Sequence, residues 1–89
     1  MKLCFLSGLK EIVGQEEFDM DFSGSLSELL EALCAKHGEG LRRVLTDPDS
    51  PAKRSPFLKI LVNGEDVRKT DPTLAGTETV FLFLPIAGG

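Results

Sequence analysis

The chain has 89 residues, the length of a single domain, and its 42% hydrophobic and 27% charged residues argue against intrinsic disorder. A net charge of −4 opposes binding to nucleic acid or to anionic lipid, since both require clustered lysine and arginine. No apolar run approaches the roughly 18 residues that a membrane span needs. We therefore expect one compact domain that binds neither nucleic acid nor membrane.

The N-terminus and the cysteines indicate the compartment. The apolar run after Met1 is too short for the core of a signal peptide, which predicts a cytoplasmic protein. Cys4 and Cys34 lie far apart and have no Cys or His partner at metal-ligand spacing. We expect reduced thiols, no disulfide framework and no metal site.

Two strands are predicted at the N-terminal end. Lys2–Ser7 is apolar and compatible with a strand. Within Glu16–Phe22, Phe18, Met20 and Phe22 alternate with acidic residues, which is typical of a half-buried strand. We expect these two strands to form a hairpin.

A helix is predicted to begin at Ser25. Ser25 and Glu28 have the spacing of a capping box, and Gly38 is placed to end the helix. Its apolar positions recur at helical spacing and give it one face to bury, namely Leu26, Leu29, Leu30 and Leu33. Leu41, Val44 and Leu45 predict a second short helical segment.

The second half of the chain predicts a loop and three strands. Prolines in Asp47–Pro51 and at Pro56 indicate a surface loop. Phe57–Val62 reads as a strand, Asn63-Gly64 as a type I′ turn and Glu65–Arg68 as a short edge strand. The unbroken apolar run Thr79–Leu84 predicts a central strand.

This order of elements predicts the fold class. A single main helix must cover one face of a mixed sheet of four to five strands, and pairing the first and last strands in parallel at its centre joins both termini into one core. The expected fold is α+β of the β-grasp, or ubiquitin-like, type. We expect residues 1–84 to form this domain and residues 85–89 to form a flexible tail.

The face of the sheet opposite the helix is a candidate docking surface. Phe81 and Phe83 share one face of the last strand, and Leu6 lies on the face of the first strand opposite Leu3 and Phe5. We predict that Phe81, Phe83 and Leu6 contribute to an apolar patch that binds partners. In the alternative, loops or the segment Leu41–Leu45 cover this face.

The sequence offers few side chains that could carry out catalysis. The sequence has one histidine, His37, which is expected to pack at the helix end, and nothing supports a Ser-His-Asp arrangement. Cys4 and Cys34 fall in apolar surroundings, where a thiol behaves as a small hydrophobic group. A domain of this size also has few apolar residues to spare for an internal pocket.

The sequence ends in Ala87-Gly88-Gly89, and glycines without a Cβ let a backbone thread a narrow channel. A terminal carboxylate is ionised at neutral pH, so it must become a mixed anhydride before a nucleophile can displace its leaving group. Pro85 restricts the chain where the tail leaves the sheet. The terminus is therefore a candidate acyl donor activated by another protein, the alternative being a frayed tail of small residues.

The whole chain resembles the MoaD/ThiS family of ubiquitin-like sulfur carriers. The specific element is the ending Phe83–Gly89, and weaker ones are Leu9–Gly14, the helix that begins at Ser25, and Val62-Asn63-Gly64. The resemblance implies that Gly89 is adenylated by an E1-like adenylyltransferase and converted to a thiocarboxylate that donates its sulfur to an acceptor synthase.

Several functional expectations depend on this resemblance. Pro85, Ile86, Ala87 and Gly88 would be recognised as the tail, the chain itself would not be an enzyme, and it would bind no cofactor because the activating enzyme uses the ATP. Molybdopterin biosynthesis is the first expectation, although Leu84 stands where that subunit usually has a proline. Sulfur carriers for cysteine or thiazole synthesis, a ubiquitin-like modifier of lysines, and an interaction module without terminal chemistry are the alternatives.

Overall fold

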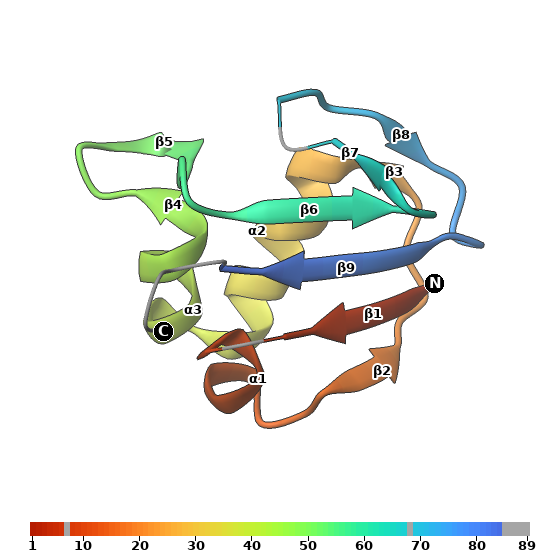
Figure 1. Ribbon diagram of the computed structural model, residues 1–89, viewed down its shortest axis with the longest axis horizontal. Coiled ribbons are helices and arrows are strands. Elements are labelled where there is room, and N and C mark those ends of the chain that lie inside the picture. Colours follow the sequence, from red (N-terminus) through yellow and green to blue (C-terminus); the bar gives the residue numbers. More distant parts are fainter. Residues whose placement is uncertain (7, 68, 85–89) are drawn as a thin grey trace.

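The computed structural model describes residues 1–6, 8–67 and 69–84. Twelve helices and strands occur in these residues (Figure 1): β1 (Lys2–Phe5), α1 (Gly8–Val13), β2 (Glu17–Asp19), β3 (Gly24–Ser25), α2 (Leu26–His37), α3 (Glu39–Leu45), β4 (Thr46–Asp47), β5 (Ser50–Arg54), β6 (Lys59–Val62), β7 (Glu65–Asp66), β8 (Thr73–Leu74) and β9 (Thr79–Phe83).

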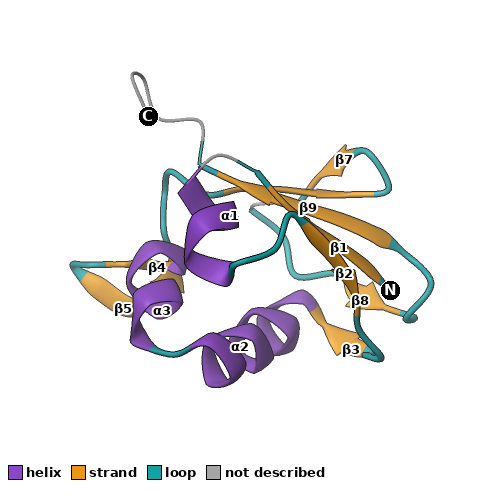
Figure 2. Cartoon of the chain, turned by 90° about the horizontal axis from the view of Figure 1, so that it is seen from below, coloured by secondary structure: helices purple, strands orange, loops and turns teal. Residues whose placement is uncertain are grey.

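A five-stranded mixed sheet forms the centre of the molecule, in the order β2-β1-β9-β6-β7. The last strand, β9, pairs in parallel with β1 and antiparallel with β6. Both the central position of β9 and its parallel partner are as predicted. Figure 2 shows α2 and α3 on one side of this sheet, which confirms the predicted β-grasp architecture.

The main helix begins as its sequence predicts. The Glu28 amide donates to Ser25 Oγ at 3.1 Å, and the Ser25 amide donates to Glu28 Oε1 at 2.9 Å, so both halves of the capping box are present. Gly38 follows the helix with φ of 86°, in the left-handed region that favours glycine. The four predicted leucines of the apolar stripe are all buried.

The core lies between the sheet and these helices. Leu3 and Phe5 of β1 and Val80 and Leu82 of β9 are fully buried against the helix layer. Leu41 and Leu45 of α3 belong to the same cluster, so the predicted second helical segment is confirmed and lies on the helix side.

The connection between the first two strands differs from the simple hairpin expected. β1 and β2 do pair antiparallel, but α1 lies between them. Leu9 is fully buried and Val13 packs against the core, so these two residues, four positions apart, give one turn of helix an apolar face. β2 is also shorter than predicted, although Phe18, Met20 and Phe22 are half-buried against the core.

The loop predicted after α3 is wrong in part, because β4 and β5 form a separate two-stranded hairpin. The Asp49 amide donates to Asp47 Oδ1 at 2.9 Å, a local bond that closes the turn. A two-stranded ribbon has free edges, where a proline removes no hydrogen bond from the main sheet. The prolines therefore exclude this segment from the main sheet rather than from every sheet.

The predicted turn after β6 is confirmed. Asn63 and Gly64 have φ values of 51° and 85°, the two positive angles that a type I′ turn requires. The turn is also tied to the central strand, because the Thr79 amide donates to Asn63 Oδ1 at 3.0 Å and the Asn63 amide donates to the Thr79 carbonyl at 2.9 Å. The short edge strand β7 follows it.

No helix in the described part of the chain combines the length and apolar character of a membrane span.

Candidate functional site

The face of the sheet opposite α2 carries apolar side chains from three neighbouring strands. Strand register places Cys4 of β1 beside Phe81 of β9, and Leu61 of β6 on the other side of Phe81. Phe83 is two residues further along β9, on the same face as Phe81, and pairs with Lys59. Phe81, Phe83 and Leu61 are all partly exposed, so they form what we call the outer patch.

Leu6 extends the outer patch at the end of β1. Its amide donates to the Leu82 carbonyl at 3.1 Å, which continues the parallel pairing by one residue, and its side chain is half-buried. The structure therefore brings together Phe81, Phe83 and Leu6, as the alternation predicted. The alternative in which Leu41–Leu45 covers this face is wrong, because Leu41 and Leu45 are buried in the core on the helix side.

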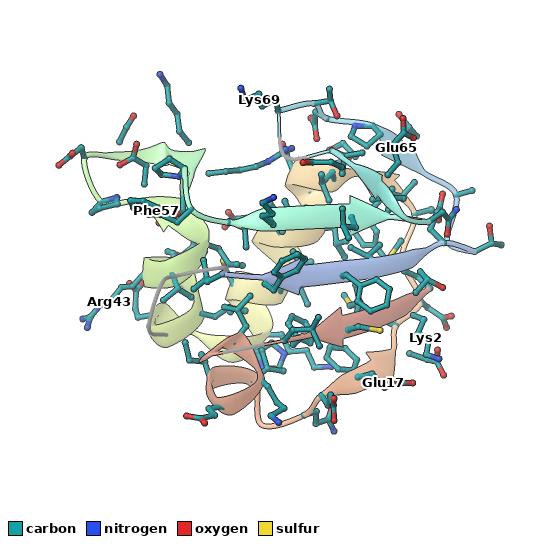
Figure 3. All side chains as sticks on the ribbon, viewed as in Figure 1. Lys2, Glu17, Arg43, Phe57, Glu65 and Lys69 are labelled. Carbon is teal, nitrogen blue, oxygen red and sulfur yellow. The ribbon has the colours of Figure 1, made fainter. Side chains whose placement is uncertain are left out.

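Charged residues border the outer patch. Lys2 and Glu17 form an ion pair of 3.1 Å at the edge made by β1 and β2 (Figure 3). The hydrogen bond from Lys2 to the Glu17 carboxylate raises the pKa of Lys2, because the carboxylate favours the charged amine. An apolar centre with a charged rim is the usual composition of a protein-binding surface.

Neither cysteine has the surroundings of a nucleophile. Cys4, which pairs with Phe81 and is 5% exposed, lies beneath the outer patch, and burial followed by the nearby Glu17 carboxylate raises the pKa of its thiol. Burial likewise raises the pKa of the Cys34 thiol on α2. Both side chains are therefore neutral thiols at physiological pH, consistent with the hydrophobic role predicted for them.

His37 packs at the end of α2. Its ring lies 6.1 Å from that of Phe18, and its Nε2 atom is buried and has no hydrogen-bond partner among the described residues. Burial, followed by the positive charge of Lys36, lowers the pKa of His37. The predicted packing role is confirmed. The described residues also contain no group of three or more His, Cys, Asp and Glu side chains placed to hold a metal ion.

The predicted reactive end lies outside the described residues. Pro85, Ile86, Ala87, Gly88 and Gly89 therefore remain predictions from the sequence. The last described residue is Leu84, which directly follows β9, so the tail is attached to the central strand of the sheet.

A groove next to Leu84 was not predicted. It has a volume of about 200 Å³, and its lining includes Arg43, Val44, Pro48, Phe57 and Leu84; we call it the exit groove. Phe57 is 66% exposed, although we predicted it as part of a strand. The sequence did hold a signal, because Pro56 directly precedes Phe57 and favours a turn over a strand at this point.

The sheet order, with β1 parallel to β9 and the helices on one face, defines a small protein of the ubiquitin-like, β-grasp class. The ThiS family model matches residues 5–89, and the chain belongs to the ThiS family, whose members are sulfur carriers and modifiers rather than enzymes. The resemblance stated from the sequence is therefore confirmed.

Solved structures agree with this assignment. SAMP1 from Haloferax volcanii is 26% identical, with a TM-score of 0.76 and coverage of 100% of this chain and 98% of that one. CysO from Mycobacterium tuberculosis is also 26% identical, with a TM-score of 0.78 and coverage of 96% and 98%. The small archaeal modifier protein 1 from Methanosarcina acetivorans, at 20% identity, shares the fold, with a TM-score of 0.81 and coverage of 99% and 94%. No curated protein sequence matches this chain.

Proposed function

We propose that this protein carries sulfur as a thiocarboxylate on Gly89. An E1-like adenylyltransferase transfers AMP from ATP to the Gly89 carboxylate and releases pyrophosphate. Sulfide then forms a bond to the carbonyl carbon and displaces AMP, which leaves the thiocarboxylate. An acceptor synthase takes the sulfur, and water supplies the oxygen that restores the carboxylate, so the chain acts as a recycled co-substrate in the cytoplasm.

Membership of the ThiS family, with a match that extends to Gly89, is the observation that carries this proposal. The outer patch adds a physical reason, since a carrier that visits two enzymes needs an apolar surface in addition to its tail. In this scheme Phe81, Phe83 and Leu6 contact the partners, and Pro85, Ile86, Ala87 and Gly88 thread the channel that leads to the partner's active site. Gly88 supplies clearance because it has no side chain.

The test is a mass measurement on the intact chain after incubation with the activating enzyme, ATP and a sulfide source. Sulfur transfer replaces one oxygen of Gly89 by sulfur, and the mass increases by that difference. A Gly89→Ala variant keeps the fold and should form little thiocarboxylate, because its added methyl group obstructs close approach. An unchanged mass for the unmodified chain with an active enzyme would contradict the proposal.

A second candidate function is a ubiquitin-like modifier, favoured by the match to SAMP1 from Haloferax volcanii, whose name describes a small archaeal modifier protein. In that case a lysine amine attacks the same acyl adenylate, and an isopeptide bond forms. Species of higher mass that resist reduction would indicate this outcome. If deletion of Gly88 and Gly89 left cellular function intact, both candidates would fail and an interaction module would remain.

We rank the candidate sulfur acceptors as the resemblance seen in the sequence ranks them. Molybdopterin synthesis comes first, and cysteine synthesis is the nearest competitor, supported by the 26% identity to CysO. Incubating the thiocarboxylated chain with a molybdopterin synthase large subunit, a cysteine synthase and a thiazole synthase separates these routes. Sulfur should be lost to only one of the three.

A further inference from the structure

The exit groove lies where the tail begins. Leu84 lines it and immediately precedes residue 85, whereas Val44 comes from α3 and Phe57 from the turn before β6. A partner that takes up residues 85–89 therefore contacts the chain next to this groove, because Leu84 lines the groove and directly precedes residue 85. The groove is therefore continuous with the part of the molecule on which the proposed function depends.

The backbone at Phe57 is held by hydrogen bonds, although the side chain is exposed. Ser55, which is 9% exposed, donates its amide to the Leu45 carbonyl at 2.9 Å and thus ties the turn to the end of α3. The Phe57 amide donates to Ser55 Oγ at 3.2 Å, and the Leu58 amide donates to the Ser55 carbonyl at 3.2 Å. A large aromatic side chain presented on such a braced turn loses little conformational freedom when it binds.

The groove also carries the positive charge of Arg43. The guanidinium of Arg43 makes no ion pair or hydrogen bond with any described residue, whereas the adjacent Arg42 is paired with Glu31 at 2.8 Å. Figure 3 shows Arg43 and Phe57 at the same end of the molecule. In a chain of net charge −4, a cation that pairs with no described residue and lies beside an apolar hollow is complementary to a carboxylate that flanks an apolar side chain.

We propose that the exit groove receives a segment of the E1-like activating enzyme that presents an apolar side chain next to a carboxylate, at the entrance of the channel that takes the tail. This inference rests on the proposed function. We name the activating enzyme as the partner because both candidate functions, sulfur transfer and lysine modification, begin with adenylation by this enzyme. The outer patch and the exit groove then form two separate contacts with one partner.

The test is an ATP–pyrophosphate exchange assay with the activating enzyme of the same organism and the full-length chain. Phe57→Ala should raise the KM for the chain about tenfold, as loss of an aromatic anchor does, with kcat within about twofold. Arg43→Glu should also raise KM, more at low salt than at high salt, and Arg43→Lys should restore most of the loss. Ile12→Ala is the matched control, because Ile12 is the other large exposed apolar side chain among the described residues, at 40%, and does not line the groove.

The outcomes separate this inference from the proposed function. If the unmodified chain supports no exchange, the proposed function fails and the inference falls with it. If exchange is normal and Phe57→Ala and Arg43→Glu match Ile12→Ala, only the groove assignment is overturned. If light scattering shows a dimer that Phe57→Ala abolishes without a change in KM, the groove binds a second copy and the inference is also overturned.

Discussion

The two faces of the central sheet differ in exposure, although the same strands build both. Along β9, Val80 and Leu82 are fully buried, whereas Phe81 and Phe83 between and beyond them remain partly exposed. All four are large apolar residues, so hydrophobicity alone does not distinguish them. The helix layer makes the difference, because it covers one face only. The inner face therefore stabilises the fold, and the outer face is free for recognition.

The largest expected effect is on the inner face. Leu82→Ala should lower the free energy of unfolding by roughly 2–5 kcal/mol, because it removes a fully buried side chain and leaves a cavity. Urea denaturation followed by far-ultraviolet circular dichroism measures this loss. A change smaller than that caused by Phe81→Ala would contradict the comparison of the two faces.

The neighbouring outer residue should show the opposite balance. Phe81→Ala is expected to weaken binding to the activating enzyme about tenfold, because the variant lacks an aromatic side chain that the enzyme would bury in the complex. Its effect on unfolding should be smaller than that of Leu82→Ala, since Phe81 is already partly exposed. Calorimetric titration of the enzyme with each variant compares them directly. Equal affinities for Phe81→Ala and the unmodified chain would remove the outer patch from the proposed interface.

The N-cap of α2 offers a further test of the difference between the two faces of the sheet, with a smaller expected effect on stability. Ser25→Ala removes one half of the capping box and should cost about 1 kcal/mol of stability. Binding should not change, since α2 lies on the side away from the outer patch. Replacing Ser25 by Thr retains the hydroxyl and serves as the control. Thermal unfolding and enzyme affinity, measured on the same samples, should respond independently.

The smallest expected effect is the pH dependence due to His37. Because its pKa in the folded state is lowered, the unfolded chain binds a proton more readily, and stability should fall as the pH drops below about 6.5. Asp71 and Glu78 also have lowered pKa values, but their contributions are lost only at more acidic pH, starting near their ordinary carboxyl values. Stability measured from pH 7.5 to 5.5 should therefore decline less in His37→Gln. An equal decline would show that His37 is not responsible.

Regular periodicity explains which elements could be predicted from the sequence. The four-leucine stripe of α2 and the alternation in β9 each repeat often enough to identify both the element and its buried face. Leu9 and Val13 provide a single i,i+4 pair, too little to distinguish α1 from a loop. The two-residue strands β3 and β8 have no period to detect.

The candidate site divides in the same way. The outer patch could be predicted because its residues alternate along individual strands, so local spacing determines their face. The exit groove could not, since Val44, Phe57 and Leu84 come together only through the tertiary fold. The roles assigned to Pro85–Gly89 rest on the sequence and on the family. The mass measurement proposed for thiocarboxylate formation at Gly89 tests them.

The position of β9 also has a mechanical consequence. Hydrogen bonds join this strand to β1 on one side and to β6 on the other, and the chain continues from its end through Leu84. A pull on the C-terminus along the strand axis is opposed by both rows of bonds at once rather than by one bond after another. Both rows must therefore yield together before β9 separates from the sheet, which makes this strand a mechanically resistant attachment for the residues that follow Leu84.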